Sequence, residues 1–389
     1  MAEFTIIELM TAVAFYITIA FLMYKYRKKA QVEGKVIFLY KLNYGLNFMK
    51  KAGEKLKPLW KIIGTIGVIV IIYFMLNTTW MFYKNMQDIF IKPETAEKAY
   101  IIIPGIQTPG SPIYLPFWHG IISLLICMVI HEGAHGIASA AEKIKIKASG
   151  VGMFLFIPLA FVEPDTKQMM KSKILSQMRI ASAGPLSNII LAFIVLLFIA
   201  NVVNPAITAL VELNGITVEG FVEGAPLQNT GISIGEIILS INDIETMNYS
   251  AFSYTLSRIA PGTEITINTD KGNYVLTTAE HPQNSSLSYI GVYPGQNWDY
   301  KQEYSQKYGF WLDVFKWFSE LLVWLANLSL ILGIMNSLPI GIADGGRIMY
   351  NLLTLFIKNE KIRNQIMSII TYGVITIIII NVAGSYLIP

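Results

Sequence analysis

Charged residues and cysteine are scarce in this sequence. Asp, Glu, Lys and Arg make up 14% of the 389 residues, whereas a soluble domain carries about 25%. This scarcity excludes an ordinary soluble protein, because too little polar chain remains to cover the apolar segments. The single cysteine, Cys127, excludes an intrachain disulfide, and we expect it to be a small packing residue.

Long apolar runs occupy much of the chain instead. Hydrophobic residues account for 53% of it, and the mean hydropathy is +0.50. A membrane span needs about 20 mostly apolar residues. Runs of this kind lie at approximately 4–24, 62–83, 115–141, 178–203, 311–335 and 365–387. The sequence therefore predicts a polytopic α-helical membrane protein with about six spans.

Basic residues gather in three connections between these spans. Lysines and arginines crowd 25–61, follow the third span at 143–173 and precede the sixth at 358–363. Because cytoplasmic connections carry an excess of Lys and Arg, we expect these three inside. Both termini, 84–114 and 204–310 should then lie outside. The net charge of +4 reflects this topology and contact with the lipid bilayer, and gives no argument for a nucleic-acid partner.

The segment 204–310 has a different composition, rich in Gly, Asn, Thr and Ser. Its patterns predict strands at 218–223 and 235–242, a helix at 249–259, and a hairpin of 264–270 with 274–278. These elements are typical of a small soluble α+β domain. The predicted domains are 1–114, an N-terminal two-span region; 115–203, the first part of a membrane core; 204–300, the inserted domain; and 301–389, the second part of the core.

The segment 150–163 is too short to cross the membrane twice as helices and too apolar for a cytoplasmic loop. Its glycines and Pro158 predict a membrane-associated β-hairpin, and an interfacial loop is the alternative. Non-helical backbone at membrane depth must be covered by protein or line a watery cavity. An edge strand there would offer unpaired amides to an extended substrate.

The third span contains the sequence HEGAH at 131–135, which holds two of the four histidines. Residues four apart lie on one face of a helix, so His131 and His135 can both offer a nitrogen to one metal ion, with Glu132 beside it as a general base. Two packed histidines are the alternative. Because ionisable groups at membrane depth are costly, we favour a metal site.

A catalytic zinc ion takes three protein ligands and leaves one position open. Glu142, Glu163 and Asp165 are candidates for the third ligand, but Asp344 is the better one. Pro339 ends the fifth span, and Asp344 follows at membrane depth before two glycines, which would let another backbone come close. An unpaired aspartate there would be costly, and a divalent metal removes that cost. The alternative is that Asp344 is the N-cap of a new helix.

A third polar cluster opens the fourth span with the sequence GPLSN at 184–188. Gly184 and the small residues at 181–183 permit tight helix contact. Asn188 is a buried amide that could donate a hydrogen bond to a developing oxyanion. An ordinary interhelical hydrogen bond is an equally good reading of it.

The motifs HEGAH at 131–135, GPLSN at 184–188 and N-x-x-P…DGG at 336–346, in this order on three spans, resemble the site-2 protease family of intramembrane metalloproteases. The resemblance covers roughly 40–387, and the sequence FVEPD at 161–165 is similar to archaeal members. It implies one zinc ion per chain and the following roles: His131, His135 and Asp344 as zinc ligands, Glu132 as general base, and Asn188 and Asn336 as groups near the substrate. The chain departs from many relatives at Gly341 and Ala343, which concerns the shape of that loop.

The inserted domain also carries a resemblance. The stretch EGAPLQNTGISIGEIILSIND at 223–243 is similar to PDZ domains attached to bacterial and archaeal membrane proteases. Such domains take an extended peptide end as an added strand, so this domain is a candidate substrate-handling module.

The expected activity is zinc-assisted hydrolysis of peptide bonds in or near transmembrane segments of membrane-spanning proteins. We expect the substrate to be trimmed on its outer side beforehand and the zinc site to lie toward the cytoplasm. Two alternatives belong to other classes. A non-catalytic PDZ-bearing scaffold would not need Glu132 or Asp344, and a metal or proton transporter should carry polar groups along several spans, whereas the second and sixth are almost wholly apolar.

Overall fold

Six helices in the described part of the chain are long and apolar enough to cross a membrane. The computed structural model describes residues 6–29, 31–33, 37–93, 96–109, 111, 113–154, 157–222, 224–282 and 284–387. The helices are α1 (Ile6–Tyr26), α3 (Lys57–Ile91), α4 (Phe117–Ala141), a segment from Ile174 to Leu210, α10 (Phe310–Met335) and α12 (Glu360–Leu387). They match the six predicted apolar runs in number and position. Residues 1–5 and 155–156, which fall in the predicted N-terminal region and hairpin, lie outside the described residues.

Two of these helices differ from the apolar runs that predicted them. Helix α3 is 35 residues long, because Pro58 can occupy the first helical turn and the polar residues after the run continue the helix. The segment from Ile174 contains α6 (Ile174–Phe198), a π-turn (Ile199–Val203) and α7 (Asn204–Leu210). Pro205, which has no N–H to donate, follows the π-turn directly.

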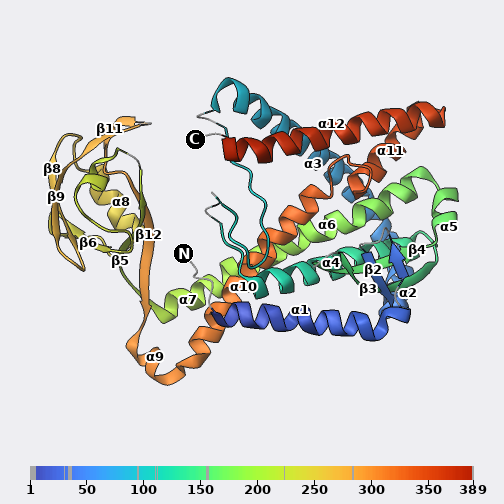
Figure 1. The fold of residues 1–389 in the computed structure, drawn as a ribbon, viewed down its shortest axis with the longest axis horizontal. Coiled ribbons are helices and arrows are strands. Elements are labelled where there is room, and N and C mark those ends of the chain that lie inside the picture. The colour runs from blue at the N-terminus through green and yellow to red at the C-terminus, as the bar shows by residue number, and fades with distance from the viewer. Residues whose placement is uncertain are drawn as a thin grey trace. The chain divides into compact units, whose positions relative to one another are not determined.

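The chain divides into two compact units, Met1–Ile199 with Trp317–Pro389 (unit 1) and Ala200–Lys316 (unit 2). In unit 1, α4 packs against α6, and α6 also packs against α3 and α11 (Asp344–Phe356) (Figure 1). Small residues allow the close contacts. A Cβ on Gly67 of α3 would lie 2.8 Å from the Leu186 side chain of α6. This agrees with the tight helix contact expected around 181–184.

A four-stranded antiparallel sheet belongs to the same unit. Its order is β1 (Gln31–Glu33), β2 (Ile37–Lys41), β3 (Ile146–Phe154) and β4 (Ile157–Pro164). The hairpin expected at 150–163 is β3–β4, with Gly150 opposite Phe161. The sequence did not reveal that β2, from the first basic connection, would pair with β3, nor that α2 (Leu46–Lys55) would pack against α4. Strand β4 is the edge of the described sheet nearest α4.

Unit 2 is an α+β unit, as predicted. Its main sheet has the order β12-β5-β6-β8-β9, with β7 paired to β6, and β10 pairs with β11. The elements are β5 (Val211–Phe221), β6 (Ile237–Ile241), β7 (Ile244–Glu245), α8 (Tyr249–Ser257), β8 (Glu264–Thr269), β9 (Asn273–Thr277), β10 (Ala279–His281), β11 (Asn284–Tyr289), β12 (Val292–Tyr300) and the following α9 (Gln302–Tyr308).

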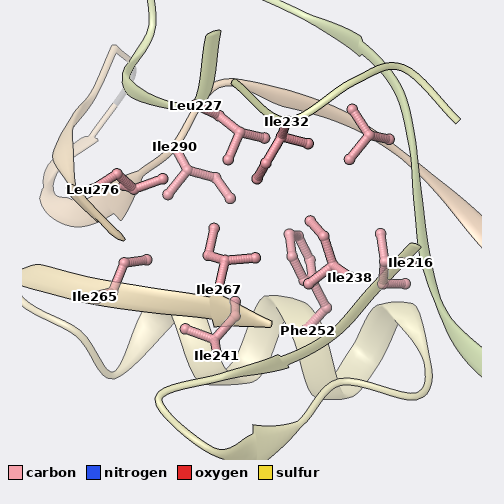
Figure 2. Close-up of a cluster of buried hydrophobic side chains, with 11 residues drawn as sticks. Ile216, Leu227, Ile232, Ile238, Ile241, Phe252, Ile265, Ile267, Leu276 and Ile290 are labelled. Carbon is pink, nitrogen blue, oxygen red and sulfur yellow. The ribbon is translucent and has the colours of Figure 1, made fainter. Parts of the chain in front are cut away.

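Branched aliphatic residues from the strands of unit 2 form its core. Figure 2 shows Ile216, Ile238 and Ile267 gathered with Phe252 of α8. In β8, buried residues alternate with more exposed ones, as in a sheet with one buried face. The strand predicted at 218–223 begins earlier, at Val211. Strand β12 was missed because Pro294 interrupts its pattern, and the register shifts there.

Candidate metal centre and active site

Helix α4 presents two imidazoles on one buried face. His131 and His135 are 9% and 7% exposed, and their Nε2 atoms lie 3.2 Å apart. The spacing of four residues places the two side chains one above the other. The HEGAH motif therefore forms a pair of nitrogens that point at one location, as predicted.

Asp344 joins this pair from a segment more than 200 residues away. Helix α10 ends at Met335, the chain turns through Pro339, and Asp344 begins α11. Its Oδ2 atom lies 3.0 Å from Nε2 of His131 and 3.1 Å from Nε2 of His135. Asp344 is 7% exposed, and Arg347 contacts its other oxygen at 3.6 Å.

The two glycines after Asp344 are required by this turn. The N–H of Gly345 donates to the Asn336 carbonyl over 2.8 Å. A Cβ on Gly345 would collide with the Ser337 carbonyl oxygen, and one on Gly346 with that of Ile340. The expected close approach of another backbone is thus present. It allows the start of α11 to pack against the end of α10.

The three atoms have the geometry of a metal site. Their separations of 3.0, 3.1 and 3.2 Å form a nearly equilateral triangle. Three ligands at about 2.0–2.1 Å from a tetrahedral zinc ion would be roughly 3.3 Å apart. Among the residues that the structure describes, His131, His135 and Asp344 are the one such cluster of three potential ligands. Their identity and spacing therefore fit zinc.

Neighbouring groups orient both imidazoles. The Nδ1 atom of His135 lies 2.7 Å from the Ile180 carbonyl oxygen, which fixes Nδ1 as the protonated nitrogen and leaves Nε2 free to bind a cation. The Asn188 amide is 3.2 Å from Nδ1 of His131 and is almost fully buried. Asn188 thus lies behind His131, on the side away from the three-atom cluster.

Gly184 sets the distance between α6 and the histidines. An ideal Cβ on Gly184 would lie 2.5 Å from Nε2 of His131 and still closer to Nε2 of His135. Atoms in ordinary contact are about 3.5 Å apart. Any side chain at this position would therefore displace the imidazoles.

The other carboxylates considered as ligands have separate partners. Glu163 pairs with Lys41 at 2.8 Å, and Asp165 caps α5 (Thr166–Lys171) by accepting from the Gln168 N–H. That hydrogen bond lowers the pKa of Asp165.

Glu142 is held at the end of α4 by Arg179, Lys61 and Ser176. Burial alone would raise its pKa, but hydrogen bonds from Ser176 and Arg179 outweigh that effect and lower it. Glu142 therefore belongs to an ion cluster that joins three helices and lies apart from the histidines.

Glu132 contacts the edge of the sheet. Its Oε2 atom accepts a hydrogen bond from the Val162 N–H of β4 over 2.9 Å. The residue predicted as general base therefore lies between the histidines of α4 and the edge strand. Asn336 is half-buried at the end of α10, where its amide donates to the Leu332 carbonyl.

Comparison with known proteins identifies the family of this chain. Residues 119–380 match the model of peptidase family M50. This chain belongs to peptidase family M50. The membership confirms the resemblance to site-2 proteases that the three motifs carry, and this M50 protein is a metalloprotease with multiple membrane-spanning helices.

Two curated relatives and one solved structure are similar to this M50 protease. "Uncharacterized protein MJ0971" of Methanocaldococcus jannaschii is 29% identical over 296 residues, which cover 72% of this chain and 73% of that one. Zinc metalloprotease RasP of Shouchella clausii is 26% identical over 114 residues, which cover 29% of this chain and 24% of RasP. The PDZ domain of an SdrC-like protein from Listeria monocytogenes matches 21% of this chain and 87% of its own, with 15% identity and a TM-score of 0.19.

Two features of the M50 site were not predicted from the sequence. The Val162 amide acts through its backbone, so no residue type signals it. The contribution of β2 and α2 was hidden because lysines dominate the connection 25–61, although an apolar run at 36–40 follows Gly34 and could have indicated a strand.

Proposed function

We propose that this M50 protein hydrolyses peptide bonds in or near the transmembrane segments of membrane-spanning proteins, using one zinc ion held by His131, His135 and Asp344. The observation that carries the proposal is the triangle of three buried ligand atoms, which the candidate membrane helix α4 and the start of α11 bring together. Zinc bound there would polarise a carbonyl group and lower the pKa of a water molecule. Peptide hydrolysis needs both effects.

The chain's own residues would handle the proton. Glu132 contacts the edge of β4, where the substrate is proposed to bind. From there it would accept a proton from the attacking water and return it to the leaving nitrogen. The hydrogen bond from Nδ1 of His135 to the Ile180 carbonyl orients the ring so that Nε2 faces the proposed metal position. Each step thus has a residue of this chain to perform it.

Asn188 is best assigned to positioning. Its Oδ1 atom has no hydrogen-bond partner among the described residues, while its Nδ2 faces Nδ1 of His131. Rotating the amide by 180° brings Oδ1 to the same place, where it accepts from Nδ1–H when Nε2 binds a cation. We therefore propose that Asn188 acts through His131, in preference to the oxyanion role suggested by its sequence position. Asn336 remains a proposed neighbour of the substrate.

The substrate would bind as an added strand on β4. The Val162 N–H points away from β3 toward Glu132, so the N–H groups at 158, 160, 162 and 164 face the free edge. Pro158 and Pro164 have none to donate. The donors at this edge are therefore confined to Ala160 and Val162, beside the catalytic base. Pairing there would unwind a helical substrate where it is cut, and Ala160→Pro should abolish cleavage without removing zinc.

Unit 2 is proposed to screen substrates. The basic connections favour an outer location for unit 2 and a zinc site toward the cytoplasm, and a PDZ-type fold would take an exposed peptide end produced by earlier trimming. Deletion of 212–296 should then relax the discrimination between trimmed and untrimmed substrates. Unchanged discrimination would count against this role.

The decisive experiment is cleavage of a single-span reporter by purified protein in detergent, comparing wild type with Glu132→Gln and measuring zinc in both. We expect about one zinc per chain in each and cleavage by wild type alone. Zinc in both without cleavage of any reporter, including trimmed ones, would favour the scaffold. Cleavage by Glu132→Gln at the wild-type rate would remove Glu132 from the mechanism.

A further inference from the structure

A cavity of about 710 Å³ lies beside Glu132, entirely within unit 1. Residues of α2, α3, α4, α6, β3 and β4 line it, and among the described lining residues Glu132 is the only charged one. Figure 1 shows α2, β3 and β4 beside α4. Its walls include Trp60, Ile137 and Leu186. The cavity therefore offers apolar surface directly next to the proposed general base.

Gly133 leaves the α4 wall of this cavity open. A Cβ at Gly133 would meet no heavy atom within 4 Å. Gly136, one turn along, is different, because a Cβ there would collide with Met49. Glycine is a poor helix former, and close packing explains Gly136 but not Gly133. The small residue at position 133 instead keeps space free beside Glu132.

The edge of β4 connects the cavity to the proposed substrate path. Ala160 and Val162, which carry the outward-facing donors, line the same cavity. Side chains of a paired strand alternate between its two faces. A substrate strand at this edge would therefore direct one side chain next to the scissile bond into the cavity.

We infer that this cavity is the subsite for a large apolar side chain adjacent to the scissile bond, and that Gly133 determines its size. The inference rests on the proposed function and adds substrate selectivity to it. An aromatic side chain would replace lipid or solvent in the cavity, while alanine would leave it unfilled. Discrimination by apolar pockets is commonly about 10- to 200-fold in kcat/KM.

The test compares reporters that differ only in the residues flanking the mapped cleavage point, with Phe or Ala at each. For wild type we expect kcat/KM to favour Phe at one flank by about tenfold or more. In Gly133→Leu the added side chain fills the space, so the ratio should fall to about one while zinc remains bound. Gly373→Leu is the matched control, since a Cβ at Gly373 of α12 also meets nothing within 4 Å but Gly373 does not line the cavity.

Each outcome decides the matter. If wild type cleaves no reporter, the proposed function fails; if it cleaves without preference at either flank, only the subsite fails, and lipid is the better occupant. A preference that survives in Gly133→Leu overturns the role of Gly133. If Gly133→Leu cleaves neither reporter, a second variant tests the inference. Ile190→Trp fills the cavity from α6, and its Phe-to-Ala ratio of kcat/KM is compared with that of wild type. An unchanged ratio in that variant refutes the inference, and a reduced ratio supports it.

Discussion

Gly184→Ala should weaken zinc binding without changing any of the proposed ligands. The new Cβ would lie 2.5 Å from Nε2 of His131 and nearer still to that of His135. Restoring an ordinary contact of about 3.5 Å requires a shift of roughly 1 Å. Metal sites tolerate deviations of only about 0.2 Å in ligand distance. The methyl group therefore acts directly on the geometry of the triangle.

The expected loss of zinc affinity follows from this displacement. Mutating a residue that merely orients a ligand costs about 10- to 100-fold in metal affinity. Because Gly184→Ala would displace two ligands at once, we expect the upper end, about 100-fold, which is about 2.7 kcal/mol. Cleavage of the single-span reporter should fall in parallel at limiting zinc.

The assay is zinc occupancy of the purified protein across a series of buffered free-zinc concentrations. Gly67→Ala is the matched control, because its Cβ would meet the Leu186 side chain at 2.8 Å, on the α3–α6 contact and away from the ligands. It should bind zinc with the wild-type midpoint. A Gly184→Ala midpoint within about threefold of wild type would refute the reasoning, since disturbing the orientation of a single ligand already changes metal affinity by about tenfold.

Three further predictions address the ion cluster, the positioning amide and the metal. Glu142→Gln should destabilise the protein by about 3 kcal/mol at pH 7, because Arg179 is left without its partner. Since the folded pKa of Glu142 lies below its ordinary value of 4.5, this difference in thermal unfolding should be full above pH 4.5 and disappear as the pH falls through the folded pKa. Asn188→Ala should weaken zinc binding by about 10- to 100-fold, while kcat at saturating zinc changes less; a large loss of kcat at full occupancy would restore the oxyanion role. Removing zinc with a chelator should abolish cleavage and re-adding it should restore activity; cleavage that persists in metal-free protein would exclude a metalloprotease mechanism.

The apolar helices and the pair of histidines on one face of α4 were predictable from the sequence because both depend on local rules. An apolar run of span length is visible without tertiary information, and residues four apart on a helix share a face wherever the helix lies. Asp344 was also accessible, since an acid at membrane depth requires a cation. Its distances to His131 and His135, however, depend on how α4, α10 and α11 pack, which no local pattern encodes.

The parts that were missed all depend on pairing between distant segments. Strand β2 is a short run in a lysine-rich connection, and only its register with β3, such as Tyr40 opposite Val151, makes it part of the sheet. Asn188 was correctly expected to be buried, but whether its amide faces a substrate or His131 depends on how α4 packs against α6. Gly184 was assigned to helix contact in general, and the structure identifies the histidines as what it contacts.

Gly184 and Gly133 show why residue type alone could not separate these roles. Both are glycines in membrane helices of the same site, yet the space beside Gly184 is filled by two imidazoles and the space beside Gly133 is empty. The same substitution should therefore have opposite effects. Gly184→Ala should bind zinc about 100-fold more weakly, whereas Gly133→Ala should keep the wild-type zinc affinity and gain up to about 1 kcal/mol in helix stability. Zinc titration and thermal unfolding of the two variants test this directly. If both lose zinc, flexibility of the helices, and not contact with the ligands, is what the glycines provide.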